Sequence, residues 1–440
     1  MNRNLKYITT ILLIIIIYSS PFAQKQENNL LTLNEAIKLT VNNHPLIKQK
    51  EAELQAAQFK VEQQKSYYLP NVSAEASYNR IAPIPAFAFG GKIMELAPAN
   101  NYNMGVFVRH TLYDFGKRES QVDYASSFLN SVKDNENLIR DDLSSQVIKV
   151  FYGILFLEKS MAVKDTQLVT LKEHLRTNDL KIKNGTATDY DALSTKTRII
   201  EINNEKIELQ NEKDKQELFL KELIGLNREK EINITGSFEL PAYSLNSDSI
   251  LNAAYNQRAE LKLSEDARST ANLQKGMVSL TDKPVLNAAV GYGFKNGYEP
   301  NIQVLRGNWY AGVSINVPIF NGNLTDNKIN ETNASIDAAD QKIKQVKESI
   351  STDVFQSVVD LKSNISRMNS TQEQIDYAGR SLERAVIQYK IGAGTNLEVL
   401  DSETALTQAR LVNIQVKYKS IMSYYSLRRA VGDLRTLTGL

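Results

Sequence analysis

The sequence predicts a mainly α-helical fold with four β-strands that suit a transmembrane β-barrel, built as two diverged copies of one structural unit. Three observations predict it. Landmarks of the first half of the chain recur in the same order in the second half. Several helical segments are much longer than those of a compact domain, and short segments between them alternate apolar and polar residues.

The first residues have the layout of a cleavable secretory signal peptide. Arg3 and Lys6 precede an apolar run at residues 8–18, and Ala23 offers a small residue at the exit. The run is shorter than the roughly 18 residues that a membrane-spanning helix needs, and no later apolar stretch approaches that length. We therefore predict a signal peptide at residues 1–23, and any membrane insertion has to use strands.

The composition argues against several classes of function. The chain holds no cysteine, which excludes disulfides, thiolate metal sites and a lipid-attachment cysteine. Removal of the signal peptide leaves equal numbers of basic and acidic residues, which gives nucleic-acid binding no support. His44, His110 and His174 stand far apart without metal-ligand spacing, and no catalytic motif occurs. We predict no enzyme, no cofactor, no metal site and no nucleic-acid partner.

The internal repeat sets the domain organisation. Residues 42–78 align with residues 256–292 without a gap, and each copy has a proline before a strand, Pro70 and Pro284. Further on, Lys181-Ile182 with Gly185-Thr186 is echoed by Lys390-Ile391 with Gly394-Thr395. Partners stay roughly 210 residues apart, as expected of a duplication with small insertions. We predict one unit at residues 24–240 and a second at residues 241–440, each with a helix, two strands and two long helices.

The helical segments are long and carry continuous apolar seams. In residues 117–184 apolar residues recur three or four apart with Gly153 as the only breaker, and residues 323–378 contain neither glycine nor proline. We predict long helices at residues 117–184, 187–224, 323–391 and 396–431, the first of them about 100 Å long. The seams indicate helix-on-helix packing along an extended axis, as in a coiled coil, and not cofactor sites.

Four segments alternate with period two, and we predict strands at residues 72–81, 103–112, 285–294 and 309–317. In the first strand the apolar residues are Val72, Ala74, Ala76 and Tyr78, and the polar ones are Ser73, Glu75, Ser77 and Asn79. The alternation of the second strand is weaker, because Phe107 falls among its polar positions. Strands of about ten residues with one apolar and one polar face match a transmembrane barrel, in which Glu75 and Arg109 would line the interior.

On patterning alone, a small soluble sheet half covered by helices fits these strands equally well. Four strands cannot close a barrel, however, and open strand edges are not tolerated in hydrocarbon, so insertion requires several chains to pool their strands. We therefore predict a homo-oligomer in a membrane. The alternative is a soluble periplasmic coiled-coil scaffold or adaptor protein, which shares the helices but has no need of apolar-outward strands.

Several motifs resemble the TolC family of outer-membrane efflux proteins. Those at the start of the chain are Leu33-Asn34-Glu35-Ala36-Ile37, Asn42-Asn43-His44-Pro45 and Leu69-Pro70. The strand exits Tyr113-Asp114-Phe115-Gly116 and Ile319-Phe320-Asn321-Gly322 are similar to that family too, as is Tyr389-Lys390-Ile391-Gly392. The resemblance covers essentially the whole mature chain. It implies a homotrimer whose twelve pooled strands form one barrel in the outer-membrane lipid, with the long helices forming a hollow α-barrel across the periplasm.

The resemblance also implies a function. It points to a passive exit duct of a tripartite efflux or type I secretion system, located in the cell outer membrane with its helical part in the periplasm. The implied partners are a periplasmic adaptor (membrane fusion) protein and an inner-membrane pump of the RND or ABC type. The cargo stays open.

Finally, the resemblance singles out the periplasmic end. In that family inward-turning helix pairs with acidic residues close this end, and those positions fall on Glu398, Asp401 and Asp189, with Asp191 nearby. Threefold symmetry would turn each carboxylate into a ring that concentrates negative potential and could bind cations. The alternative is ordinary solvated charge at helix starts, where acids interact favourably with the helix dipole.

The turns beside these acids are the expected docking points of an adaptor, with Gly185, Gly392 and Gly394 at their tips. A family member has an arginine where this chain has Gly394, so a latch built on that arginine is not expected here. The spacing of Glu383 and Glu403 puts these two acids elsewhere on the helices.

Overall fold

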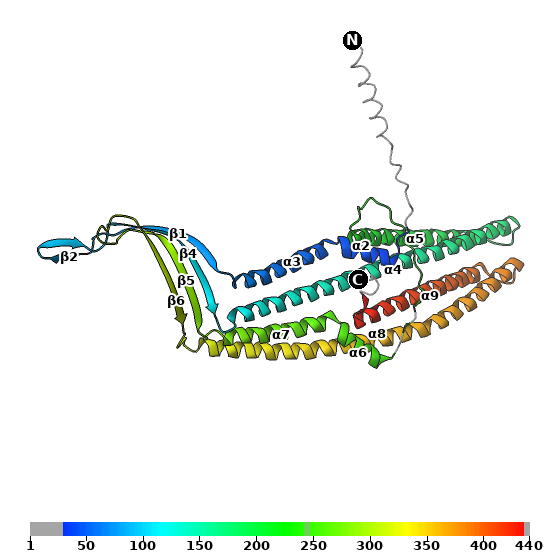
Figure 1. The fold of residues 1–440 in the computed structure, drawn as a ribbon. Helices are drawn as coiled ribbons and strands as arrows, with labels where there is room; N and C mark the ends of the chain where they lie inside the picture. The colour runs from blue at the N-terminus through cyan, green and yellow to red at the C-terminus, as the bar shows by residue number, and fades with distance from the viewer. Residues whose placement is uncertain (1–29, 242, 244–245, 435–440) are drawn as a thin grey trace, which may run out of the picture.

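The computed structural model describes residues 30–241, 243 and 246–434, and it shows an elongated molecule. A β-sheet lies at one end and the closed ends of two helical hairpins lie at the other, with long helices between them (Figure 1). The predicted signal peptide at residues 1–23 lies outside the described residues. The fold is the predicted one, mainly helical with a strand region at one end of long helices.

The internal repeat is confirmed by the order of the elements. The first copy runs α2 (Leu33–Asn43), α3 (Pro45–Ser66), β1 (Asn71–Arg80), β4 (Asn100–Tyr113), α4 (Lys117–Lys183) and α5 (Asp189–Ile224). The second copy runs α6 (Ser247–Gln257), α7 (Ala259–Ser279), β5 (Val285–Lys295), β6 (Arg306–Asn316), α8 (Leu324–Ile391) and α9 (Asn396–Val431). The expected boundary at residues 240 and 241 falls in the segment between α5 and α6 and stays a prediction.

Two features differ from the sequence prediction. The single helix expected before each strand pair is two helices, which meet at His44 in the first copy and at Arg258 in the second. At the first junction Pro45 cannot continue a helix but suits the first position of a new one, and His44 Nδ1 accepts a hydrogen bond from the Leu46 N–H. The segment between β1 and β4, where no strand was predicted, contains a hairpin of β2 (Ala86–Phe89) and β3 (Lys92–Glu95).

The main sheet is antiparallel with strand order β1-β4-β5-β6, so β1 and β6 are its two edges. The two copies meet in the middle of the sheet, where Val106 of β4 pairs with Tyr292 of β5. A bulge between Thr111 and Tyr113 shifts the register near the end of β4. Each chain therefore supplies one continuous curved sheet with two unpaired edges.

Both strand-to-helix transitions use consecutive residues in the left-handed region. Phe115 and Gly116 have φ of 56° and 88° before α4, and Gly322 and Asn323 have φ of 69° and 63° before α8. Glycine and asparagine tolerate this conformation better than other residues do, which accounts for the motifs at the strand exits. In the first copy, the side chain of Asp114 also accepts hydrogen bonds from the N–H groups of Gly116 and Arg118.

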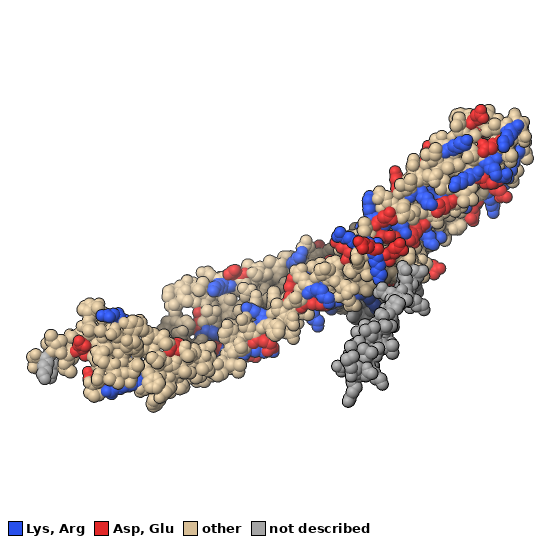
Figure 2. Space-filling view, turned by 90° about the horizontal axis from the view of Figure 1, so that it is seen from above, with Lys and Arg blue, Asp and Glu red and all other residues tan. Residues whose placement is uncertain are grey.

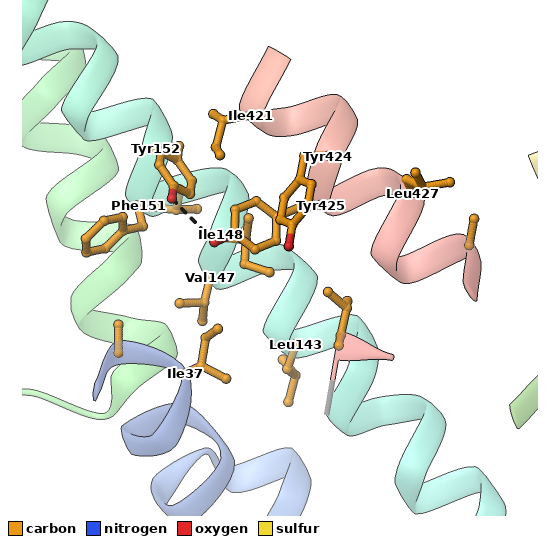
Figure 3. Packing of buried hydrophobic residues seen from close by; sticks show 14 of the residues in the cluster. Ile37, Leu143, Val147, Ile148, Phe151, Tyr152, Ile421, Tyr424, Tyr425 and Leu427 are labelled. Atoms are coloured by element: carbon orange, nitrogen blue, oxygen red, sulfur yellow. Dashed lines mark hydrogen bonds between the residues drawn. The ribbon is translucent and has the colours of Figure 1, made fainter. Parts of the chain in front are cut away.

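The hydrophobic core sits in the middle of the molecule, where helices of both copies meet. Tyr152 of α4 points toward Tyr425 of α9, Phe151 points away from α9 on the other side of α4, and Ile37 reaches α4 from α2 (Figure 3). The hydroxyls of Tyr152 and Tyr425 lie 3.4 Å apart and their ring centroids 5.5 Å apart. This core ties the two repeats together and leaves both ends of the molecule to local packing.

Charged side chains are spread unevenly over the length. In Figure 2 the strand end carries few of them, whereas basic and acidic residues crowd the half that holds the ends of the hairpins. Within the described ranges, none of the helices combines the length and the apolar character that crossing a membrane requires. The two ends of the molecule therefore suit different surroundings.

Candidate functional site

The ends of the hairpins α4–α5 and α8–α9 are built by the same turn. Gly185 and Gly392 adopt φ of 69° and 82°, and the next residue returns its N–H to the carbonyl of Lys181 or Gln388, each at 2.8 Å. This is the hydrogen-bond pattern of a glycine-terminated helix. In both hairpins the glycine is followed three residues later by a threonine that caps the next helix. The structure thus matches Gly185 with Gly392, and the match with Gly394 expected from the sequence is two residues off.

Two of the four candidate carboxylates are helix caps. Asp191 Oδ2 accepts hydrogen bonds from the Thr188 N–H and hydroxyl at 3.0 and 2.9 Å. Glu398 Oε2 accepts the Thr395 N–H at 2.7 Å, and the Glu398 N–H returns a bond to the Thr395 hydroxyl at 3.2 Å. Both pairs are capping boxes, so Asp191 and Glu398 also have a structural role at the starts of α5 and α9.

Asp189 and Asp401, the other two candidates, are exposed. Gly394 is more confined than its position in a turn suggests, because a Cβ there would lie 3.0 Å from the Gln388 Cβ and 3.1 Å from Glu398 Oε2. Any larger side chain at this position would press on the capping carboxylate. The bare backbone of Gly394 therefore preserves the turn that presents Glu398.

A buried polar cluster joins the two hairpins. Asn396, in the first turn of α9 and 5 % exposed, inserts its amide group into the α4–α5 hairpin. Asn396 Oδ1 lies 2.6 Å from His174 Nε2 and 3.0 Å from Asn178 Nδ2, and Asn396 Nδ2 donates to the Ser194 hydroxyl at 2.9 Å and the Asp191 carbonyl at 3.3 Å. One side chain thus holds the start of α9, with Glu398, against the start of α5, with Asp191.

His174 is the titratable member of this cluster. Because Asn396 Oδ1 can only accept, the short contact requires a proton on His174 Nε2. Burial lowers the pKa of His174 below its usual value, although the bond to Asn396 and the charge of Asp191 act in the opposite direction. The ring packs 5.1 Å from that of Tyr389, over which the Lys181 ammonium lies at 4.6 Å. We conclude that a neutral imidazole occupies this joint near pH 7.

A second polar contact crosses between the hairpins farther from the tip. Gln167 of α4 donates to Glu403 Oε2 of α9 at 2.6 Å, and the Thr407 hydroxyl donates to Glu403 Oε1 at 2.9 Å. Glu403 is only 3 % exposed, and this burial raises its pKa. Glu403 lies elsewhere than the candidate acids, as expected, but it is buried and hydrogen-bonded and is therefore no neutral control for surface charge. Glu383 is exposed and serves that purpose.

Large apolar side chains are exposed around the hairpin ends. Ile391, beside Gly392, is 74 % exposed, and the same region includes Leu180, Tyr190, Leu193 and Leu397. Isolated exposed hydrophobic residues are common, but clusters of them mark surfaces that other molecules cover.

At the opposite end, the register of the main sheet separates a largely apolar face from a largely polar one. Residues that pair across neighbouring strands share a face. One face carries the rows Val72–Val108–Val290–Ala311 and Ala74–Val106–Tyr292–Trp309, and its side chains are largely exposed, Trp309 by 75 %. The other face carries the rows Asn71–Arg109–Ala289–Gly312 and Glu75–Gly105–Gly293–Asn308. Glu75 and Arg109 form an ion pair of 2.8 Å on this polar face.

Sequence reasoning missed the cluster around Asn396, although signals for it exist. His174 and Asn178 continue the spacing of three and four from Leu171, so polar residues occupy positions of a buried seam. A threonine followed three residues later by an acidic residue indicates the capping role of Asp191 and Glu398. Among the described residues no group of three or more side chains is arranged to hold a metal ion.

Comparison with known proteins places this arrangement in a family. Residues 36–226 and 250–433 each match the family model described as outer membrane efflux protein, so the match covers both repeats and most of the chain. The chain belongs to the outer membrane efflux protein family.

Individual relatives are distant but extend over most of the molecule. Outer membrane protein TolC of Vibrio cholerae is 20 % identical over 398 residues, covering 89 % of this chain and 88 % of the relative. Among solved structures, the outer membrane protein VceC of Vibrio cholerae superposes with a TM-score of 0.75 at 17 % identity, covering 91 % of this chain and 96 % of VceC. The CmeC outer membrane channel of Campylobacter jejuni gives a TM-score of 0.77 at 18 % identity, covering 92 % and 86 %. These likenesses establish the fold over 91 % to 92 % of the chain.

Proposed function

We propose that this chain is one subunit of a trimeric outer-membrane channel, which serves as the exit duct of a tripartite efflux or type I secretion system. The observation that carries the proposal is the main sheet, with its largely apolar exposed face and its two unpaired edges. Water does not stabilise such a face, whereas lipid does. A soluble periplasmic scaffold or adaptor, the alternative, gives this face no purpose.

The unpaired edges support assembly from several copies. Because the four strands alternate in direction, β6 of one chain runs antiparallel to β1 of the next, and the sheet can continue from chain to chain. Only a closed barrel removes the edges in hydrocarbon. Three copies, the number implied by the resemblance to the family, would give a twelve-stranded barrel, between the filled interior of eight strands and the wide pore of about sixteen.

The surface of the single chain supports the same conclusion. Its accessible area is 27700 Å², whereas the scaling law for compact monomers gives roughly 17,000 Å² for this mass. The elongated helices and the open sheet contribute to this excess, and other copies would cover part of their surface. In the assembled trimer the helices would enclose the continuation of the pore through the periplasm.

The hairpin ends are the proposed contact with a periplasmic adaptor protein, which would link the channel to an inner-membrane pump of the RND or ABC type. The turns at Gly185, Gly392 and Gly394 carry the exposed apolar residues Ile391 and Leu397. Crosslinkers at Lys183 and Lys390, which flank these turns, should capture the adaptor in the cell envelope. Capture only at residues 295–308, at the other end of the molecule, would show that the orientation is reversed.

The carboxylates Asp189, Asp191, Glu398 and Asp401 are the proposed lining of the periplasmic mouth. Their placement at the starts of α5 and α9, joined by Asn396, supports this role. The test is a double variant, Glu398→Gln with Asp401→Asn, in planar-bilayer recordings. Glutamine keeps the capping pattern, so the change removes charge without unwinding α9. We expect weaker cation selectivity and weaker block by divalent cations, with Glu383→Gln as the matched control; unchanged selectivity would refute the lining role.

The channel itself is tested by assembly. The mature protein should partition into outer-membrane fractions and give the mass of three chains by native mass measurement in mild detergent. A stable monomer, or a mature chain that stays soluble without detergent, would contradict the proposal. As a passive duct, the protein should show no enzymatic activity of its own.

A further inference from the structure

The polar face of the main sheet carries two aromatic side chains, Phe107 and Tyr310. The other side chains on this face, in the described strands, are polar, charged or small, except Val285 at one end. Both rings lie in a single row across the sheet, Ser73–Phe107–Gly291–Tyr310, one on each side of Gly291. An otherwise polar face therefore carries one pair of neighbouring aromatic residues, and each repeat contributes one of them.

Gly291 makes room for this pair. A Cβ on Gly291 would lie 2.5 Å from Tyr310 Cε1 and 2.7 Å from Phe107 Cδ1, so no other residue fits without displacing a ring. The ring centroids are 6.1 Å apart, with a tilt of 32° between the planes. Both rings thus lean over bare backbone and form one low aromatic platform instead of standing up into solvent.

The next row of the sheet adds a charge and a flat floor. It runs Arg109–Ala289–Gly312, so the two positions beside Tyr310 and Gly291 have almost no side chain. A Cβ on Gly312 would meet no atom within 4 Å. The Arg109 guanidinium lies 5.7 Å from the Phe107 centroid and is held by Glu75 at 2.8 Å. The aromatic pair, the flat surface over Ala289 and Gly312, and the guanidinium of Arg109 are therefore adjacent on this face of the sheet.

We propose that Phe107, Tyr310 and Arg109 form a stacking site for planar aromatic molecules that bear an acidic group, located on the inner wall of the strand region. The inference rests on the proposed function, because the polar face lines a pore only if the chains form a barrel. A flat ring would lie against Tyr310 and Phe107 over Ala289 and Gly312, and its acidic group would meet the guanidinium. Such a site retains cargo briefly on its way out and makes the channel selective for ring-bearing molecules.

The competing explanation is structural: the rings cover the exposed backbone of Gly291, as aromatic residues do beside glycines in other sheets. The two explanations differ in what happens when the rings are removed. A covering role affects assembly alone, whereas a stacking site loses discrimination between flat rings and other shapes in channels that assemble normally.

The test compares two probes of equal charge, naphthalene-1-sulfonate and cyclohexanesulfonate, in planar-bilayer recordings of the full-length protein. We expect the naphthalene probe to block the parent channel more tightly, and the Phe107→Ser/Tyr310→Ser variant to lose about three- to tenfold in affinity for it, the range of one aromatic contact. Block by cyclohexanesulfonate should not change. Tyr310→Phe keeps the ring and should keep the preference, and Asn308→Ser, on the same face, is the matched control.

Only conducting channels enter the comparison, so a variant that fails to assemble is not counted as a loss of binding; Tyr310→Ser alone then takes the place of the double variant. A conducting parent that is blocked equally by the two probes overturns the stacking site, and so does a ring-free variant that retains the preference. A parent protein that gives no ion conductance refutes the channel itself, and the two failures are thereby distinguished.

Discussion

Replacement of Asn396 by alanine is the sharpest test of how the hairpins are held together. This side chain alone bonds to five groups of the α4–α5 hairpin, which are His174, Asn178, the Thr195 and Ser194 hydroxyls and the Asp191 carbonyl. The main hydrophobic core lies far from this point along α4, and the apolar contacts near the tip come from two small clusters around Leu171 and Val399. Asn396→Ala removes the polar contacts and leaves these two clusters in place.

The magnitude follows from the burial of the partners. A hydrogen bond contributes about 1 kcal/mol net, and a buried group left without its partner costs roughly 1–3 kcal/mol. Asn178 is fully buried and His174 nearly so. His174 is left without this partner, whereas Asn178 still donates to the Asp191 carbonyl and the Thr195 hydroxyl. One stranded group together with the lost bonds gives about 3 kcal/mol per chain, which corresponds to a roughly hundredfold increase in local opening of the joint.

Amide hydrogen exchange measured by mass spectrometry gives this number region by region. Peptides from the end of α4 and the starts of α5 and α9 should lose about two orders of magnitude of protection, while peptides around Phe151 in the core should not change. Thr404→Ala, which removes the acceptor of an exposed bond from Arg198 between the same hairpins, is the matched control and should have a small effect. Unchanged protection at the tip in Asn396→Ala would refute the view that this residue joins the hairpins.

Three further predictions concern titratable groups. His174 has a lowered pKa in the folded chain, so the protection of amides at the hairpin ends should be constant above about pH 6.5 and should fall as the pH drops from there through the folded-state pKa. His174→Gln, measured by the same hydrogen exchange, should show a weaker pH dependence. Glu403 has a raised pKa, so the stability that this residue contributes is lost as the pH rises through its folded-state pKa. Glu403→Gln, whose amide would pair with Gln167, should therefore raise the thermal midpoint at pH 7 relative to the parent. Asp266 also has a raised pKa, because of burial and then the neighbouring Asp134, so Asp266→Asn should stabilise the α4–α7 contact at pH 7 and leave stability at pH 4 nearly unchanged, as read from thermal unfolding at the two pH values.

The long helices and strand faces could be predicted because each depends on a short-range period. Spacing of three and four residues fixes a helical seam, and spacing of two fixes a strand face. The weak alternation of β4 shows the limit of this reasoning. Phe107 belongs to the polar face, and the reason is Gly291 on the neighbouring strand, which leaves room for its ring. A pairing between residues so far apart in sequence is invisible to any local pattern.

The hairpin of β2 and β3 was missed for a different reason. The segment contains prolines between residues 83 and 98, but Gly90-Gly91 between two apolar segments is a hairpin signal. Both glycines have positive φ, 58° and 79°, as the tight turn requires, and Phe87 pairs with Met94 across it. The glycine pair carried more information than the prolines around it.

Divergence of the repeat at one position explains why the two hairpins are not equivalent. The turns at Gly185 and Gly392 match residue by residue, so Asn396 is the counterpart of Asp189. The neutral amide of Asn396 can be buried once its hydrogen bonds are satisfied, whereas a carboxylate in the same place would pay the cost of burying a charge. Asp189 accordingly stays exposed. The two copies of the turn therefore differ: Asn396 at the start of α9 is buried against the α4–α5 hairpin, whereas Asp189 at the start of α5 remains a charged, exposed side chain.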